Sequence, residues 1–249
     1  MTNPAIVIIP GAWHRPKHYQ HLINSLAKVN YEAVGVTMPS VDSSPPHASW
    51  DQDAQAVRRV ILEYLDAGRD VIAVAHSFGG IAMSEAVKGL GKQDREKQGL
   101  KGAVVRLIYM TAMALPKGQT HVGQIKPTTP EEEEIERQRQ EMQAKYEIIG
   151  LVFYTGCDPK DVQEAVDMLG SFPTGPLSVP ATYSAFKEIP STYIVCNNDL
   201  ALPVSVQKRM IAQGEGAFHV EECNEGHSPF MSNPGFIVDC IRRAAGEDV

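Results

Sequence analysis

The residues of this chain best suited to do chemistry gather around Ser77. Residues 75–80 read Ala-His-Ser-Phe-Gly-Gly and directly follow the apolar run of residues 71–74. This is the strand, sharp turn and helix context that exposes a nucleophilic serine, and Gly79 and Gly80 let the strand and helix backbones come close together. Ala75 stands where a first glycine is usual. The pattern predicts that Ser77 is a nucleophile, and the alternative is a small residue in an ordinary turn.

A nucleophilic serine needs a histidine base and an acid that orients it, which after such a turn follow in the order acid, then histidine. Residues 191–196 are rich in β-branched and aromatic side chains and predict a strand that ends shortly before Asp199. Residues 218–223 predict another strand, and His227 lies in the turn that follows it. Because chemistry collects at the carboxyl ends of parallel strands, we expect Ser77, Asp199 and His227 at one edge of the sheet.

Each of these assignments has an alternative. Asp53 or Asp158 would be the acid if Asp199 were only a helix N-cap. His219 also follows Asp199, but it falls within a predicted strand, and we expect it to be too buried to act as a base. His76 is expected to be structural, because its side chain points away from the cleft if that of its neighbour points in.

Attack by a serine creates an oxyanion, and loss of one hydrogen-bond donor to that charge costs about a hundredfold to a thousandfold in rate. One donor is normally the N–H that follows the nucleophile, here that of Phe78, and the other lies in the loop after an earlier strand. Residues 6–9 predict that strand, and Pro10-Gly11-Ala12-Trp13-His14 forms its loop. Ala12 N–H is the predicted second donor, because Gly11 allows the backbone to turn toward the site.

Four segments together carry a family resemblance: Val-Ile-Ile-Pro-Gly-Ala-Trp-His, Ala-His-Ser-Phe-Gly-Gly, Asn-Asp-x-Ala-Leu-Pro and Gly-His-Ser-Pro-Phe-Met. They resemble the compact α/β-hydrolases of the plant methylesterase and hydroxynitrile lyase group and their microbial relatives, and the resemblance spans nearly the whole chain. It implies the α/β-hydrolase fold. It also implies that Ser77 is the nucleophile, His227 the general base and acid, and Asp199 the residue that orients His227.

The same group contains lyases that cleave cyanohydrins without an acyl-enzyme. In the family that this chain resembles, such lyases carry a threonine in the first oxyanion loop and a lysine directly after the catalytic histidine. Gly11 and Ser228 stand at the corresponding positions here. Without the lysine, no obvious group would stabilise a departing cyanide, which favours a hydrolase.

Strand and helix patterns alternate along most of the chain, which predicts an α/β fold with a mostly parallel sheet flanked by helices. The predicted strands are residues 6–9, 32–36, 71–74, 104–110, 191–196 and 218–223, and the predicted helices include residues 16–29, 50–65, 204–212 and 234–245. A length of 249 residues suits one domain. We expect a core of about residues 1–112 and 188–249 and a helical cap inserted at about 113–187.

The predicted cap is too long and too patterned for a plain loop. It contains an acidic run at 131–134 with a charged helical stretch to about residue 147, then segments 151–154 and 161–169. The acidic run is expected to be a solvated helix face. A cap would cover Ser77, supply apolar walls and exclude water. The aromatic and histidine residues that are candidates to line the pocket are Trp13, His14, Tyr19, Phe153, Tyr154 and Tyr183.

Charge and the start of the sequence argue against several functional classes. Lysine and arginine number 23 against 30 acidic residues, giving a net charge of −7, which disfavours nucleic acid or an anionic membrane as partner. The start of the chain has no basic segment, and its apolar run is too short for a signal peptide or membrane span, so we expect a cytoplasmic protein.

No cofactor or metal is expected. His14, His18 and His21 recur at helix-like intervals but lack carboxylate or cysteine partners, so they do not predict a metal site. The four cysteines are widely spaced and are expected to be reduced thiols. They are Cys157, Cys196, Cys223 and Cys240.

The sequence therefore predicts a serine hydrolase that cleaves a small carboxylic ester or lactone through an acyl-enzyme on Ser77. Two alternatives stay open: a lyase or cyclase that uses the same pocket without acylation, and a small-molecule binding protein that retains the three residues. The expected partner is a small-molecule substrate, and the sequence leaves open whether the chain forms a homodimer.

Overall fold

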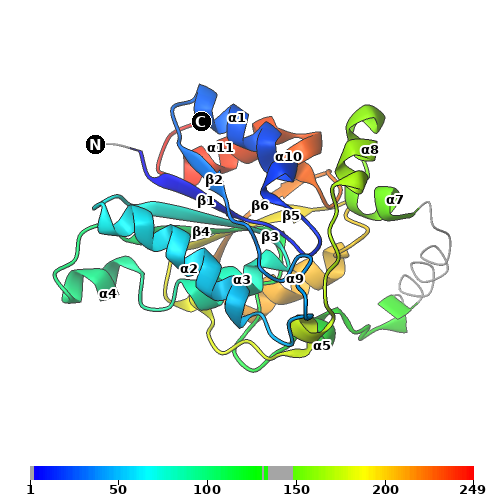
Figure 1. The fold of residues 1–249 in the computed structure, drawn as a ribbon, viewed down its shortest axis with the longest axis horizontal. Coiled ribbons are helices and arrows are strands. Elements are labelled where there is room, and N and C mark those ends of the chain that lie inside the picture. The colour runs from blue at the N-terminus through cyan, green and yellow to red at the C-terminus, as the bar shows by residue number, and fades with distance from the viewer. Residues whose placement is uncertain (1–2, 131, 134–147) are drawn as a thin grey trace.

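The structure, a computed structural model, describes residues 3–130, 132–133 and 148–249. A six-stranded sheet, in the order β2-β1-β3-β4-β5-β6, runs through its centre (Figure 1). Every strand pair in it is parallel. The strands are β1 (Ala5–Ile9), β2 (Ala33–Gly35), β3 (Val71–Ser77), β4 (Val104–Ala112), β5 (Ser191–Cys196) and β6 (Phe218–Cys223).

The central strands are buried on both faces, which explains their continuous apolar sequences. All five residues of β1 and all six of β5 are buried, as are six of the seven in β3. Strand β6 differs, because it forms an edge of the sheet and contains only exposed and half-buried residues. Burial on both faces therefore holds the ends of the central strands β1, β3 and β5 in place.

Helices cover both faces of the sheet (Figure 1). On one face, α1 (Gln20–Lys28), α10 (Pro229–Ser232) and α11 (Pro234–Ala244) pack over one apolar cluster, to which Leu22, Phe230 and Ile237 belong. On the other face lie α2 (Asp51–Asp66), α3 (Gly79–Ala86) and α9 (Val204–Gln213), with a second cluster. The short helix α4 (Lys92–Lys97) lies between α3 and β4 in the chain. The expected helix over residues 16–29 is divided into a 3-10 turn, η1 (Pro16–Tyr19), and α1.

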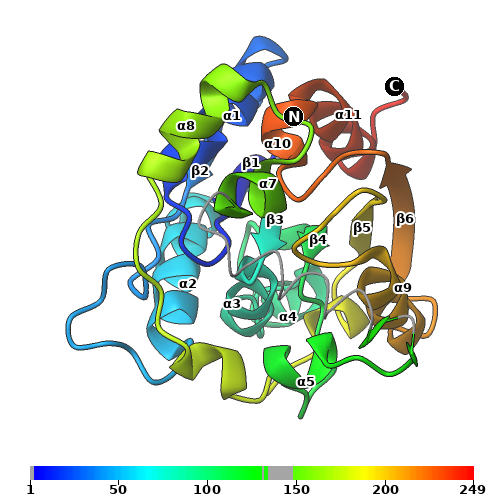
Figure 2. The ribbon, with the colours of Figure 1, turned by 90° about the vertical axis from the view of Figure 1, so that its right-hand side faces the viewer.

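The chain between β4 and β5, residues 113–190, is here called the insertion. Its described helices are α5 (His121–Ile125), α7 (Ile148–Tyr154) and α8 (Pro159–Asp167), with the 3-10 turns η2 (Gly175–Ser178) and η3 (Ala185–Lys187). Helices α7 and α8 lie at the end of the sheet where β3 runs into α3 (Figure 2). Most of the charged stretch expected over 131–147 lies outside the described residues.

Hydrogen bonds and ion pairs join the insertion to the rest of the molecule. Gly170 N–H donates to the carbonyl of Trp13 at 2.9 Å, and Ser171 N–H donates to Oδ1 of Asp42 at 2.7 Å. Glu132 pairs with Arg209 of α9 at 2.9 Å, and its side chain is only 12% exposed. The expectation that the whole acidic run is a solvated face is therefore wrong for Glu132, because this carboxylate ties the insertion to α9.

Within the described ranges, no helix is long and apolar enough to cross a membrane.

Candidate active site

Ser77 ends β3 in a conformation that few side chains adopt. Its φ is 53°, in the left-handed region, where a residue other than glycine is strained. A Cβ added to Gly79 would lie 2.5 Å from the carbonyl oxygen of Ile9, and one added to Gly80 would overlap the carbonyl oxygen of Met113. The two glycines are therefore required by the close approach of strand and helix, and they leave Ser77 at the tip of the turn.

The structure brings Asp199 and His227 into direct contact. Nδ1 of His227 lies 2.7 Å from Oδ2 of Asp199, and both side chains are almost fully buried. Because an ionised carboxylate can only accept hydrogen bonds, Nδ1 carries the proton and donates it. The loop after β5 fixes the other carboxylate oxygen, since the N–H groups of Ala201 and Leu202 each donate to Oδ1 at 2.8 Å.

Thr111 adds a fourth donor to this carboxylate. Its hydroxyl donates to Oδ2 of Asp199, the oxygen that also faces His227. Analysis of the sequence did not identify Thr111, because it is an ordinary residue near the end of a predicted strand. The three donors from Thr111, Ala201 and Leu202 together hold the carboxylate toward His227.

The alternative acids lie elsewhere. Asp53 is buried at the start of α2, where Oδ1 accepts from Ser40 N–H at 2.9 Å, and burial raises the pKa of this carboxyl. Asp158 is the exposed N-cap of α8 and accepts from Lys160 N–H. Of the described carboxylates, Asp199 is the one paired with His227.

His219 contradicts one expectation. Its side chain is 68% exposed, so the argument that strand burial excludes it as a base is wrong. Strand β6 is the edge of the sheet, and all six of its residues are exposed or half-buried. His219 is distinguished from His227 by its neighbour instead: it faces Glu221 at 3.9 Å, outside the loop that holds Asp199.

His76 supports the site from behind. Its Nε2 lies 2.8 Å from the backbone carbonyl of His227, to which it donates, and its Nδ1 accepts from the hydroxyl of Tyr19 at 2.8 Å. The same hydroxyl accepts from Gly11 N–H at 3.1 Å. Burial holds the pKa of His76 well below its usual value, so the ring is neutral. His76 thus links the loops after β1 and β6, which is the structural role expected from the sequence.

The loop after β1 passes directly beside Ser77. A Cβ on Gly11 would lie 2.9 Å from the Cβ of Ser77, so only glycine allows this approach. The next residue, Ala12, is buried. Within the described part of the chain, the N–H groups of Ala12 and Phe78 have no hydrogen-bond acceptor. Both predicted donors are therefore free to bind another oxygen.

His14 holds this loop and connects it to the insertion. Its Nδ1 donates to the carbonyl of Ala12 at 2.8 Å, and its Nε2 accepts from the hydroxyl of Tyr154 in α7 at 3.1 Å. Burial lowers the pKa of His14 to about 3, so the ring stays neutral, with one nitrogen that donates a hydrogen bond and one that accepts. His14 and Tyr154 are therefore loop supports, and the sequence had suggested them only as pocket lining.

Aromatic rings form a continuous arc from His227 to Phe78. The ring of Phe153 in α7 lies 5.7 Å from that of His227 and 5.6 Å from that of Trp13, between ring centroids. Phe172 continues the arc, 5.5 Å from Trp13 and 4.9 Å from Phe78. The sequence suggested Trp13 and Phe153 as lining, but it did not identify Phe172.

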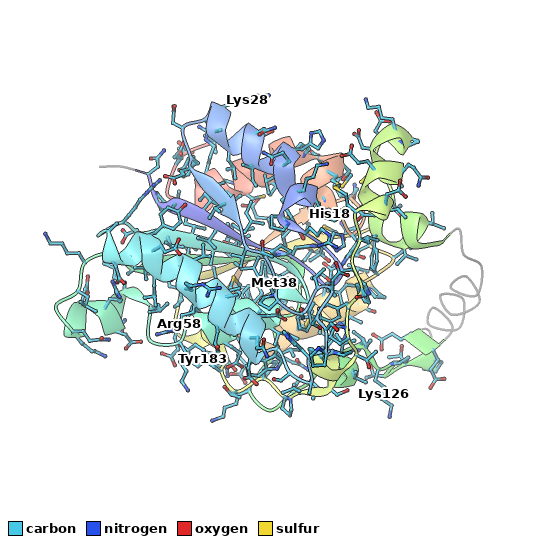
Figure 3. The ribbon with its side chains drawn as sticks, in the orientation of Figure 1. His18, Lys28, Met38, Arg58, Lys126 and Tyr183 are labelled. Carbon is cyan, nitrogen blue, oxygen red and sulfur yellow. The ribbon has the colours of Figure 1, made fainter. Side chains whose placement is uncertain are left out.

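Two of the remaining aromatic candidates do not join this arc. Tyr19 is fully buried beneath the loop after β1. Tyr183 packs against Lys88, on the side of the molecule away from His18 (Figure 3). In the described residues, no group of three or more histidine, cysteine or carboxylate side chains is arranged to hold a metal ion.

Comparison with known proteins identifies the family of this chain. A family model described as the alpha/beta hydrolase family matches residues 6–239. The chain is 47% identical over 250 residues to the alpha/beta hydrolase nvfD of Aspergillus novofumigatus, covering 100% of this chain and 99% of that protein.

Solved structures are similar in fold at lower identity. A pyrethroid hydrolase from Sphingobium faniae JZ-2 superposes with a TM-score of 0.78 at 20% identity, covering 98% of this chain and 97% of that one. The methylesterase MES16 from Arabidopsis gives a TM-score of 0.71 at 20% identity, covering 98% and 99%. The predicted fold class and family resemblance are thereby confirmed, and the chain belongs to the alpha/beta hydrolase family.

Proposed function

We propose that the protein is a serine hydrolase that cleaves a small, uncharged carboxylic ester or lactone through an acyl-enzyme on Ser77. The observation that carries this proposal is the buried pair of His227 and Asp199, 2.7 Å apart, at the same end of the sheet as the strained Ser77. A nucleophile, a base and an acid in these roles are the parts that acyl transfer requires.

The proposed reaction begins with proton transfer. The free Nε2 of His227 takes the proton of Ser77, whose oxygen attacks the carbonyl carbon of the substrate. Asp199 stabilises the imidazolium that forms, because its Oδ2 accepts from Nδ1. His227 then gives the proton to the leaving alcohol, and the acyl group stays on Ser77.

The N–H groups of Ala12 and Phe78 would bind the oxyanion in both halves of the reaction. Water, activated by His227, attacks the acyl-enzyme and releases the acid. Preorganisation supports this role, since the hydrogen bond from His14 to the carbonyl of Ala12 fixes the loop before substrate arrives. Fixed donors cost no reorganisation when the charge develops.

The aromatic arc supports an apolar substrate. Phe153, Phe172 and Trp13 present ring faces and edges near His227 and Phe78, and none of them carries a charge. An apolar wall desolvates the reacting carbonyl and strengthens the hydrogen bonds to its oxygen. We therefore assign the insertion the role of a cap, with α7 contributing Phe153.

The names of similar proteins agree with ester hydrolysis. The pyrethroid hydrolase and the methylesterase both carry a hydrolase or esterase name, and each covers nearly the whole chain. Their identity to this chain is 20%, so they support the fold and leave the substrate to be found by experiment.

The test is labelling of the purified protein with a fluorophosphonate, followed by peptide mass spectrometry and assay of a panel of neutral aryl and alkyl esters. We expect the label on Ser77, and we expect Ser77→Ala and His227→Ala to abolish both labelling and turnover. His219→Ala is the matched control, because His219 is exposed on β6, the strand that precedes His227 in the chain. This variant should leave both labelling and turnover unchanged. Absence of labelling in the folded protein would reject the acyl-enzyme and favour a lyase or cyclase, or a binding protein.

A further inference from the structure

Two cysteines face each other at the ends of the two strands that precede Asp199 and His227 in the chain. Cys196 ends β5 and Cys223 ends β6, and the two residues are paired across the parallel strands. Their Sγ atoms lie 3.7 Å apart, and both thiols are free. The other two cysteines lie elsewhere: Cys157 is near the carbonyl of Ser228, and Cys240 is near the carboxylate of Glu221.

The pairing suits a disulfide. Neighbouring strands lie about 4.7–4.9 Å apart, within the Cα separation of about 4.4–6.8 Å that disulfides span. Residues paired in register on parallel strands also direct their side chains to the same face. Closing the bond needs the two sulfur atoms to approach from 3.7 Å to about 2.0 Å. A modest movement of the two strand ends provides this.

The two thiols are not equivalent. Cys196 is fully buried, whereas Cys223 is partly exposed to solvent. The hydrogen bond between them lowers the pKa of the Cys223 thiol, and the same bond together with burial raises that of Cys196 well above its usual value. Because the thiolate is the reactive form, an oxidant reaches and attacks Cys223 first.

We propose that Cys196 and Cys223 form a modification site in which a peroxide converts the thiol pair into a disulfide. The thiolate sulfur of Cys223 attacks one peroxide oxygen, the O–O bond breaks, and protonation of the leaving oxygen gives water and a sulfenic acid. The sulfur of Cys196 then attacks that of Cys223, so that the S–S bond forms as the S–O bond breaks. The hydroxyl leaves as water with the proton of Cys196. Two thiols are oxidised and one peroxide is reduced.

The site is coupled by position to the candidate active site. Asp199 follows Cys196 by three residues, and His227 follows Cys223 by four. Asn197 N–H donates to the carbonyl of Cys223 at 2.9 Å, which already joins the two strand ends. The Nδ1–Oδ2 contact of 2.7 Å between His227 and Asp199 depends on the separation of the loops that follow. Drawing the strand ends together disturbs this contact, so oxidation lowers turnover. This consequence rests on the proposed function, whereas the disulfide itself does not.

The experiment treats the full-length protein with hydrogen peroxide, alkylates the remaining thiols, and maps peptides by mass spectrometry. We expect two fewer alkylated cysteines, a linked peptide pair containing Cys196 and Cys223, and reversal by dithiothreitol. Cys223→Ser should abolish the link. Cys157→Ser, which alters another partly buried thiol, should leave it intact. Sulfinic acid on Cys223, a different cysteine pair, or no change would each overturn the proposal.

Ester turnover is measured on the same samples. We expect a several-fold, dithiothreitol-reversible fall in kcat in the native protein and in Cys157→Ser, and no fall in Cys223→Ser. A disulfide that forms without changing kcat would overturn the coupling to the active site. If the protein hydrolyses no ester at all, the proposed function fails, and the mapped disulfide still decides whether the thiol pair is a modification site.

Discussion

The hydroxyl of Thr111 donates a hydrogen bond to Oδ2 of Asp199. Thr111 is fully buried, and its φ is 38°, outside the regions that a β-branched residue normally adopts. Such strain costs about 1–3 kcal/mol and persists only where the surroundings enforce it. Thr111 lies at an irregularity in the pairing of β3 with β4, between Met110, which pairs with His76, and Ala112, which pairs with Ser77, and its backbone directs the hydroxyl at the carboxylate. Thr111 is therefore a positioning residue for Asp199.

We expect Thr111→Val to reduce kcat for an ester by about tenfold to a hundredfold, because a hydrogen bond to a charged group is worth roughly 1.5–3 kcal/mol and each step of about 1.4 kcal/mol corresponds to about tenfold in rate. KM should change little, since Thr111 acts through Asp199 and does not reach the substrate. Thr111→Ser, which keeps the hydroxyl, should recover most of the activity. The matched control is Thr192→Val, which alters another buried threonine one strand away. Equal loss in the serine and valine variants would contradict the role of the hydroxyl.

The chain of hydrogen bonds from Tyr154 through His14 to Ala12 predicts that the insertion supports the oxyanion loop. Tyr154→Phe leaves Nε2 of His14 buried without its donor and frees the ring to turn. We expect kcat to fall about threefold to tenfold, less than the hundredfold or more that follows loss of an oxyanion donor itself.

Steady-state kinetics of Tyr154→Phe beside Tyr183→Phe checks this expectation. Tyr183 belongs to the same insertion but packs against Lys88, away from the loop. The Tyr183 variant should retain the native kcat. If both variants retain it, the hydroxyl of Tyr154 does not support the loop.

The close approach at the turn after Ser77 predicts a large effect of one added methyl group. A Cβ on Gly80 would overlap the backbone of Met113, which cannot move without displacing β4. Overpacking of this kind costs about 1–3 kcal/mol or more, which lowers Tm by roughly 2–4 °C per kcal/mol in a chain of this size.

Thermal denaturation followed by circular dichroism measures the effect of Gly80→Ala. Gly235→Ala is the matched control, because the nearest atom to its added Cβ is 3.9 Å away and the residue lies in α11. We expect Gly235→Ala to leave Tm unchanged or slightly raised, since alanine favours a helix over glycine by up to about 1 kcal/mol. An unchanged Tm in Gly80→Ala would mean that the turn can open.

The predicted site residues could be placed from the sequence because each lies at the end of a strand or within four residues after it. Ser77, Asp199 and His227 are marked by local patterns of a few residues, and parallel strands carry such ends to one edge. Thr111 and Phe172 could not be identified in this way. Thr111 meets Asp199 across 88 positions of the chain, and no local pattern encodes that contact. The burial of His219 was mispredicted because a strand pattern alone does not imply burial: β6 is an edge strand and carries the polar side chains of His219, Glu221 and Glu222.

Two buried neutral histidines predict how stability depends on pH. Burial lowers the pKa of His14 to about 3 and holds that of His76 well below its usual value. The unfolded chain binds these protons near about pH 6.5 and the folded chain does not, so the unfolded state gains protons first as pH falls. The stability that the folded state draws from keeping these histidines neutral is complete above about pH 6.5, and it is lost progressively as the pH falls toward about 3. Glu132 also stabilises the folded state, because its hydrogen bonds outweigh burial and lower its pKa to about 2. Its contribution to the free energy of unfolding is lost only as the pH falls below the ordinary pKa of a glutamate.

We therefore expect Tm to fall between about pH 7 and about pH 5, where the histidines titrate and Glu132 does not yet contribute. His14→Gln should lower Tm at neutral pH through the lost hydrogen bonds, but its Tm should fall less steeply with pH than that of the native protein. His21→Gln, which alters an exposed histidine, is the matched control and should keep the native slope. The comparison of slopes removes the contribution of every other titrating group. An identical slope in the native protein and in His14→Gln would mean that His14 binds its proton over the same pH range in the folded and unfolded states. Once protonated, Nε2 of His14 could no longer accept from the hydroxyl of Tyr154, which would contradict the proposed relay from Tyr154 to Ala12.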